Sequence, residues 1–233
     1  VMASQGAGGP KDEATAALYY KKSLQTWKKE ADDGDAKAAL WAALVYERKL
    51  VPDSSPEKSV PYLLQAAESG NLTAQGLLAF KYRDGLGVPQ DAAKAVEWFE
   101  KAASRKDLGA VMELGIMFRD GKYLPPDREK AFHWFEKGAE WKDPYSMAAL
   151  ADMLLEGTPS AEQAARALAL YREAAAVGYF PAALKAAELL QNGKGGELDA
   201  DEAYRLLRRV ADAAGDPKAM YMLAQVYYTR GDE

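Results

Sequence analysis

Apolar and small residues recur along this chain at helical spacing, and the recurrence has a fixed period. The segment KAVEWFEKAASRKD at residues 94–107 returns 36 residues later as KAFHWFEKGAEWKD at residues 130–143. A self-similar period of this length is typical of arrays in which each unit buries its apolar face against its neighbours. The pattern therefore predicts a helical repeat protein rather than a globular domain with one central core.

Short corners separate the predicted units. They follow one another at steps of 36, 36, 36, 36 and 37 residues, at Gly34-Asp35, Gly70-Asn71, Lys106-Asp107, Lys142-Asp143, Gly178-Tyr179 and Gly215-Asp216. The expected units lie near residues 12–34, 35–70, 71–106, 107–142, 143–178 and 179–215, with a partial unit at 216–233. Residues 1–11 are small, polar and glycine-rich, and we expect a flexible leader there. Residues 12–233 are expected to form one solenoid domain.

Two helices, A and then B, are predicted in each full unit. Helix A carries small and large apolar residues three and four positions apart, which places them on one helical face. A glycine is expected to close helix A, because glycine adopts the left-handed conformation of a helix end without a Cβ clash. These closing glycines are Gly85, Gly121, Gly157 and Gly193.

Helix B is predicted from an acidic start followed by an apolar stripe. Asp91, Asp127 and Asp199 stand where a side-chain carboxylate can cap the first turn of a helix. Trp98 and Trp134 occupy the same position in successive units. Their recurrence at the repeat period predicts that both are packing anchors between helices.

Two segments near the start of the chain depart from this pattern. A helix is expected from about residue 12 to 32, with Leu18, Leu24 and Trp27 at its apolar positions. In the first full unit, Pro56 could open helix B, but Pro61 would then lie inside the helix and remove a hydrogen bond. We therefore expect a late start or a kink in that helix.

The combined pattern resembles the Sel-one-like repeat (SLR) family, relatives of the tetratricopeptide repeats. The resemblance rests on A helices of the form A-x-x-x-L-G/A-x-x-Y/F-x-x-G, loops of the form G-x-G-V-x-x-D and B helices of the form K-A-x-x-W-F-x-K-A-A. The unit at residues 73–107 matches almost throughout, whereas the next unit has Tyr123-Leu124 in place of Gly-Val. The resemblance implies an all-α fold, a right-handed α/α superhelical solenoid of about five to six helix-turn-helix repeats of 36 residues, with the A helices lining its concave side.

Composition narrows the possible chemistry. The formal charge of −5 argues against binding to nucleic acid, which needs clustered Lys and Arg. There is no cysteine and one histidine, His133, so thiolate sites and Ser-His-Asp or Cys-His arrangements are nearly excluded. The sequence contains no run of 18 apolar residues, so we expect no insertion into a membrane. We expect no enzymatic activity, no cofactor and no metal site.

The A-helix positions that packing does not require are the predicted partner-binding residues. By comparison with tetratricopeptide repeats, they lie two before, two after and about five after the large consensus residue. The selected positions are Leu44, Glu47, Phe80, Arg83, Met112, Ile116, Arg119, Asp152, Glu156, Glu188, Tyr221 and Tyr228. Trp141, at a corner between units, is a separate candidate hot spot, and packing under Tyr145 is the alternative.

These observations predict a protein-interaction module that binds a peptide, loop or domain of a protein partner. The favoured role is a scaffold or adaptor, since the resemblance implies protein binding in a generic sense. The alternatives are an immunity-type inhibitor of a secreted bacterial toxin and a regulatory fragment of a larger protein. We expect a monomer. A periplasmic or secreted location is favoured over the cytoplasm, although the first residues do not look like a signal peptide.

Overall fold

The computed structural model describes residues 12–195 and 198–230, so the predicted leader at residues 1–11 lies outside them. The described residues are almost entirely helical, without a strand. The helices are α2 (Glu13–Asp32), α3 (Ala36–Glu47), α4 (Pro56–Glu68), α5 (Leu72–Asp84), α6 (Ala92–Ala103), α7 (Leu108–Asp120), α8 (Arg128–Glu140), α9 (Pro144–Leu154), α10 (Ala161–Ala176), α11 (Phe180–Asn192), α12 (Ala200–Ala214) and α13 (Pro217–Arg230).

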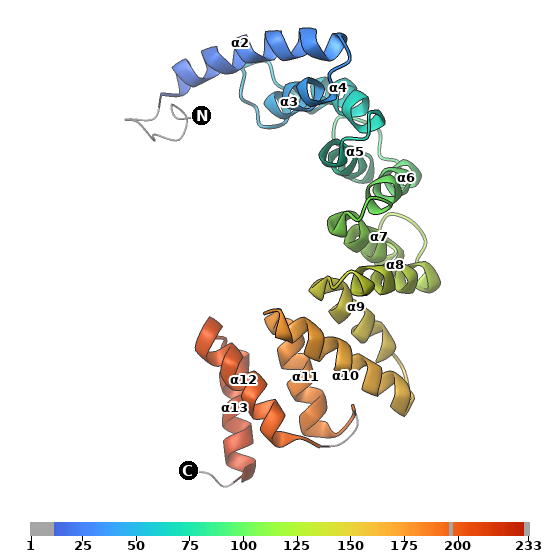
Figure 1. Ribbon diagram of the computed structural model, residues 1–233, viewed down its shortest axis with the longest axis vertical. Helices are drawn as coiled ribbons and strands as arrows, with labels where there is room; N and C mark the ends of the chain where they lie inside the picture. The colour runs from blue at the N-terminus through green and yellow to red at the C-terminus, as the bar shows by residue number, and fades with distance from the viewer. Residues whose placement is uncertain (1–11, 196–197, 231–233) are drawn as a thin grey trace. The chain divides into compact units, whose positions relative to one another are not determined.

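The helices belong to two compact units. The first unit reaches to Leu114 and includes Gly121–Pro125, and the second holds Gly115–Asp120 and the chain from Pro126 onward. In the first unit, consecutive helices among α2, α3, α4, α5 and α6 pack against one another, and in the second the same holds for the series α8 to α13 (Figure 1). This nearest-neighbour packing confirms the predicted all-α solenoid of helical repeats.

The predicted corners are the most regular feature of the backbone. Their first residues all have a positive φ: Gly34, Gly70, Lys106, Lys142, Gly178 and Gly215. At Lys106 and Lys142, φ is 63° and 62°, a region that non-glycine residues rarely adopt. The next residue then caps helix A; for example, the Asp107 side chain accepts a hydrogen bond of 2.8 Å from the Ala110 amide. One dipeptide thus ends helix B and starts the following helix A.

The turns within the repeats also follow the prediction in most units. Gly85, Gly121 and Gly193 end their helices in the left-handed region. The predicted aspartate caps of α6, α8 and α12 each accept a hydrogen bond from the backbone amide three residues later. α9 is the exception: it ends at Leu154 and is capped by Leu155, so Gly157 lies in the loop beyond the cap.

The core lies between neighbouring helices and uses small residues to bring them together. Trp98 and Trp134 are buried, which confirms their prediction as packing anchors. Gly115 shows why the small residues matter: a Cβ at this position would lie 2.5 Å from Cε1 of Phe135. Any larger residue there would separate α7 from α8 or displace the phenylalanine.

Two expectations near the start of the chain need correction. Helix α4 begins at Pro56 and contains Pro61, so the late start is wrong, whereas the kink stays a prediction. Pro56 is tolerated because the first amide of a helix has no partner within the helix. Leu18 is 52% exposed, whereas Leu24 is buried as predicted. The buried residues of α2, Ala16, Leu24 and Ala31, define a different face from the one that contains Leu18.

The strained corner at Lys106 gives a stability test. Lys106→Gly is expected to raise the free energy of unfolding by up to about 1 kcal/mol, because glycine removes the Cβ strain of the left-handed conformation. Lys106→Ala keeps the Cβ and should give no such gain. Urea denaturation of the two variants checks this expectation; an equal gain from both would contradict it.

Candidate functional site

Glu47, a predicted binding residue, forms part of a buried ion pair in the first unit. Its Oε1 lies 2.6 Å from Nζ of Lys81, whose side chain is 4% exposed. The same ammonium donates to the carbonyl oxygens of Leu86 and Pro56, at 3.1 and 3.4 Å. A buried lysine needs such partners to offset the loss of hydration. Glu47 therefore joins α3 to α5 instead of facing a partner with a free carboxylate.

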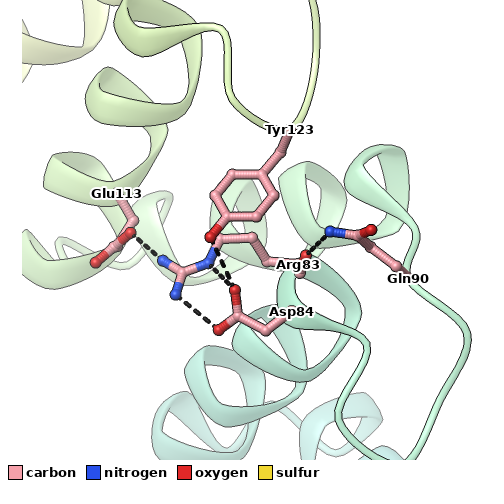
Figure 2. A network of polar contacts seen from close by, with 5 residues as sticks. All are labelled: Arg83, Asp84, Gln90, Glu113 and Tyr123. Atoms are coloured by element: carbon pink, nitrogen blue, oxygen red, sulfur yellow. Dashed lines mark hydrogen bonds and ion pairs between the residues drawn. The ribbon is translucent and has the colours of Figure 1, made fainter.

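Arg83, a second predicted binding residue, lies at the centre of a polar network in the first unit (Figure 2). Its Nε and Nη2 each donate to Asp84 at 2.8 Å, and its Nη1 donates to Glu113 Oε2 at 2.6 Å. Tyr123 donates to Asp84 Oδ1 at 3.1 Å. The Arg83 side chain is 18% exposed and the Glu113 side chain 16%. Three N–H groups of this guanidinium are thus already bound to carboxylates of the same chain.

Aromatic rings and burial set the electrostatics of this network. The guanidinium carbon of Arg83 lies 4.8 Å from the ring centre of Phe80 and 5.3 Å from that of Tyr123. Hydrogen bonds from Arg83 lower the pKa of Asp84. Burial raises the pKa of Glu113, and the nearby Arg83 charge opposes that rise. The network holds α5, α7 and the loop after α7 in register.

Arg119 occupies the position of Arg83 one repeat later, but its surroundings differ. Its Nε donates to Asp120 Oδ1 at 2.6 Å, and this bond raises the pKa of Arg119. The guanidinium carbon lies 5.6 Å from the ring centre of Phe135. Among the described residues, Asp120 is the only carboxylate that forms an ion pair with Arg119. The residue 36 positions after Glu113 is Ala149, which has no carboxylate.

A small hollow in the second unit brings Arg119 together with Asp152, another predicted binding residue. It is lined from α7, α9 and α11, and its wall comprises Arg119, Tyr145, Ala148, Ala149, Asp152, Tyr179, Pro181 and Lys185. The ring centres of Tyr145 and Tyr179 are 6.5 Å apart, with the rings edge to face. The volume of the hollow is about 60 Å³. We define these eight residues as the α7–α9–α11 hollow.

Asp152 is already engaged on one side of this hollow. Its Oδ1 accepts hydrogen bonds from the Tyr171 hydroxyl and from Lys185 Nζ. Tyr171 is 1% exposed, and burial raises its pKa. The carboxylate of Asp152 therefore satisfies a buried hydroxyl and holds Lys185 at the rim of the hollow.

The other predicted positions differ in how far they are available. Leu44, Phe80, Met112 and Ile116 are half-buried on their A helices. Glu156 is exposed and lies 3.3 Å from Arg128, and Glu188 is exposed on α11. Tyr221 and Tyr228 are 65% and 90% exposed on α13. Trp141 is half-buried at the end of α8, with Lys137 Nζ 5.6 Å from its ring centre.

The sequence reasoning missed Tyr145, Tyr179 and Lys185 of the hollow, and Asp84, Glu113 and Tyr123 of the Arg83 network. A signal for part of this was present in the sequence. The dipeptide Arg-Asp occurs at residues 83–84 and again at 119–120, so a comparison of the two repeats would have exposed the change from Glu113 to Ala149. The three tyrosines carry no comparable signal, because none of them recurs at the repeat period.

The described part of the chain contains neither a metal site nor a membrane-spanning helix. Within it, no group of three His, Asp or Glu side chains is arranged to hold a metal ion. No helix in that part combines the length and apolarity needed to cross a membrane.

The buried ion pair of Glu47 and Lys81 gives a test of a structural role. Glu47→Gln is expected to lower the free energy of unfolding by about 3 kcal/mol, because it leaves the ammonium of Lys81 buried without a carboxylate. Glu68 is exposed on α4, and Glu68→Gln should change stability by less than about 0.5 kcal/mol. Chemical denaturation measures both; similar losses would contradict the role of Glu47.

The two equivalent arginines are expected to differ in their contribution to stability. Arg83→Gln should cost about 1–3 kcal/mol, because it leaves the carboxylate of Glu113 largely buried without its cation. Arg119→Gln should cost less than about 1 kcal/mol, since it removes one partly exposed ion pair. Denaturation curves of the two variants compare these costs. A larger cost for Arg119→Gln would contradict this difference between the two ion pairs.

Comparisons with known proteins agree with the observed fold. The model of the Sel1 repeat matches the chain seven times, at residues 1–25, 37–71, 73–107, 109–140, 144–179, 181–214 and 217–232. None of the curated proteins matches the chain.

Two solved structures are similar over most of the chain. One is c5321, described as a protective antigen present in uropathogenic Escherichia coli strains displaying an SLR fold; it is 29% identical with a TM-score of 0.71, and the match covers 98% of this chain and 47% of that one. The other, a Sel1 repeat protein from Oxalobacter formigenes, is 23% identical with a TM-score of 0.68, and the match covers 90% and 85% of the two chains. This chain thus spans about half the length of the E. coli protein. Because the seven repeat matches extend over most of its length, the chain belongs to the Sel1 repeat family.

Proposed function

We propose that this protein is a non-catalytic scaffold or adaptor that binds a segment of a protein partner at the α7–α9–α11 hollow. The observation that carries the proposal is the meeting of Arg119, Tyr145 and Tyr179 around one depression on the A helices. Sel1 repeat proteins are generally protein–protein interaction modules, and this chain belongs to that family.

The size of the hollow favours a side chain of a protein over a small molecule. Pockets for drug-sized ligands and cofactors have volumes of about 300–1,000 Å³. The hollow, at about 60 Å³, can take the end of one side chain. A partner segment would place that side chain in the hollow and lay its backbone across α9 and α11.

The lining also has the composition of an interface centre. Tyrosine and arginine are enriched at protein interfaces, because they provide a large contact area together with a polar end. The Tyr179 hydroxyl, like that of any tyrosine, is protonated near neutral pH and can donate a hydrogen bond, and burial raises its pKa further. A sequence with one histidine and no cysteine supports a binding role over catalysis.

Photo-crosslinking in the cells that naturally produce the protein tests this proposal. p-Benzoylphenylalanine in place of Tyr179 is expected to yield a covalent adduct with one protein, because the residue is half-buried at the hollow. The matched control places the same amino acid at Ala169, which is exposed on α10 outside the hollow. Adducts from Ala169 but none from Tyr179 would contradict the proposed face. An adduct with a secreted toxin would favour inhibition over a scaffold role.

A further inference from the structure

Arg83 and Arg119 occupy equivalent positions in two successive repeats, but among the described residues Arg119 lacks the second carboxylate partner that Arg83 has. Arg83 and Arg119 are 36 residues apart, each near the end of an A helix and each followed by an aspartate. Both donate from Nε to that aspartate, at 2.8 and 2.6 Å. The two Arg-Asp pairs therefore share the hydrogen bond from Nε to the following aspartate.

The two arginines differ in the partner of the terminal nitrogens of the guanidinium. Nη1 of Arg83 donates to Glu113, which comes from the next A helix. The position of Glu113 in the following repeat is occupied by Ala149, and Ala149 lines the α7–α9–α11 hollow together with Arg119. The hollow therefore lies where the Arg83 site has a glutamate side chain.

The charges around the hollow balance in pairs, because Arg119 pairs with Asp120 and Lys185 pairs with Asp152. Arg83 differs from Arg119 in binding a second carboxylate, that of Glu113, in addition to Asp84. The Asp152 carboxylate already accepts from Lys185 and from the buried Tyr171 hydroxyl. Arg119 is about one-third exposed, so its guanidinium can be reached from solvent. A carboxylate binds a guanidinium with charge-assisted hydrogen bonds, which are stronger than neutral ones.

We propose that the α7–α9–α11 hollow binds a glutamate side chain of the partner, whose carboxylate takes the place on Arg119 that Glu113 takes on Arg83. This inference rests on the proposed function and specifies the chemistry of the partner. Tyr145 and Tyr179 contact the methylene groups of that side chain, and Lys185, paired with Asp152, lies at the rim. The partner segment is acidic at its anchoring residue.

NMR spectroscopy of the protein with ¹⁵N-labelled arginine tests the proposal directly. The probe is N-acetyl-glutamate α-amide, which presents a single side-chain carboxylate, and the matched control is the neutral N-acetyl-glutamine amide at the same ionic strength. The Nε–Hε signal of Arg119 is expected to shift saturably with the glutamate probe alone. The signal of Arg83 should not move, because its guanidinium is already bound to Asp84 and Glu113. An equal response to both probes, or none, would overturn the inference.

N-Acetyl-glycine, the third probe, presents a chain-terminal carboxylate. We expect it to bind Arg119 more weakly than the glutamate probe, because the carboxylate that binds the equivalent Arg83 belongs to a glutamate side chain, Glu113. Tighter binding of N-acetyl-glycine would overturn the assignment to a side chain and indicate a C-terminal carboxylate of the partner.

A substitution within the chain provides the complementary test. Ala149→Glu supplies the missing carboxylate from α9 and is expected to weaken binding of the glutamate probe at least about tenfold, because Arg119 is then satisfied internally. Arg119→Gln should also abolish binding, whereas Arg83→Gln should leave the affinity of the hollow unchanged. Unaltered probe binding by Ala149→Glu, in a variant whose NMR spectrum shows it to be folded, would contradict the inference.

The same variants separate this inference from the proposed function. If Tyr179 crosslinks to a partner and Arg119→Gln abolishes the adduct, both stand. If the adduct persists in Arg119→Gln and in Ala149→Glu, the face binds a protein but the carboxylate inference is wrong. If the probe binds Arg119 but Tyr179 gives no adduct, the anion site stands and the proposed protein-binding face is wrong.

Discussion

The corner between repeats is the constraint on which the rest of this structure depends. A residue in the left-handed conformation ends helix B, and in most repeats an aspartate or asparagine then caps helix A. Since both jobs are done by adjacent residues, the direction of each new helix is fixed within a single peptide unit. Lys106 and Lys142 keep the left-handed conformation without being glycine, so the neighbouring packing must hold the backbone there.

Side chains also reinforce the corners between repeats. Gln65 on α4 and Arg209 on α12 donate hydrogen bonds to the carbonyls of Ala31 and Ala175, near the ends of α2 and α10. Arg105, in the corner after α6, donates to the carbonyl of Gly70. The carbonyls of Ala31 and Ala175 also accept from the amides of Gly34 and Gly178, so each side chain adds a further donor at the corner. Gln65 and Arg209 occupy the same position of the repeat, so a glutamine and an arginine make the equivalent bond there.

Local rules predicted the fold well, because caps, closing glycines and periodic apolar positions depend on residues close in sequence. The candidate site could be predicted only in part. Arg83 and Arg119 lie at the same position of helix A in successive repeats, so the sequence predicted the same partner-binding role for both. What separates them is the residue that meets each arginine from the next A helix, Glu113 in one case and Ala149 in the other. Such pairing between helices has no local signature, so only the folded chain shows it.

The pairing of Arg83 with Glu113 has a consequence for how a repeat protein can diversify. The repeats share one backbone structure, and the arginine near the end of helix A, Arg83, is bound by a glutamate of the next A helix, Glu113. A single change from glutamate to alanine in a copied unit uncovers the arginine without altering the helix that carries it. New recognition can thus arise in such an array by the loss of a side chain, with the backbone of the repeat unchanged.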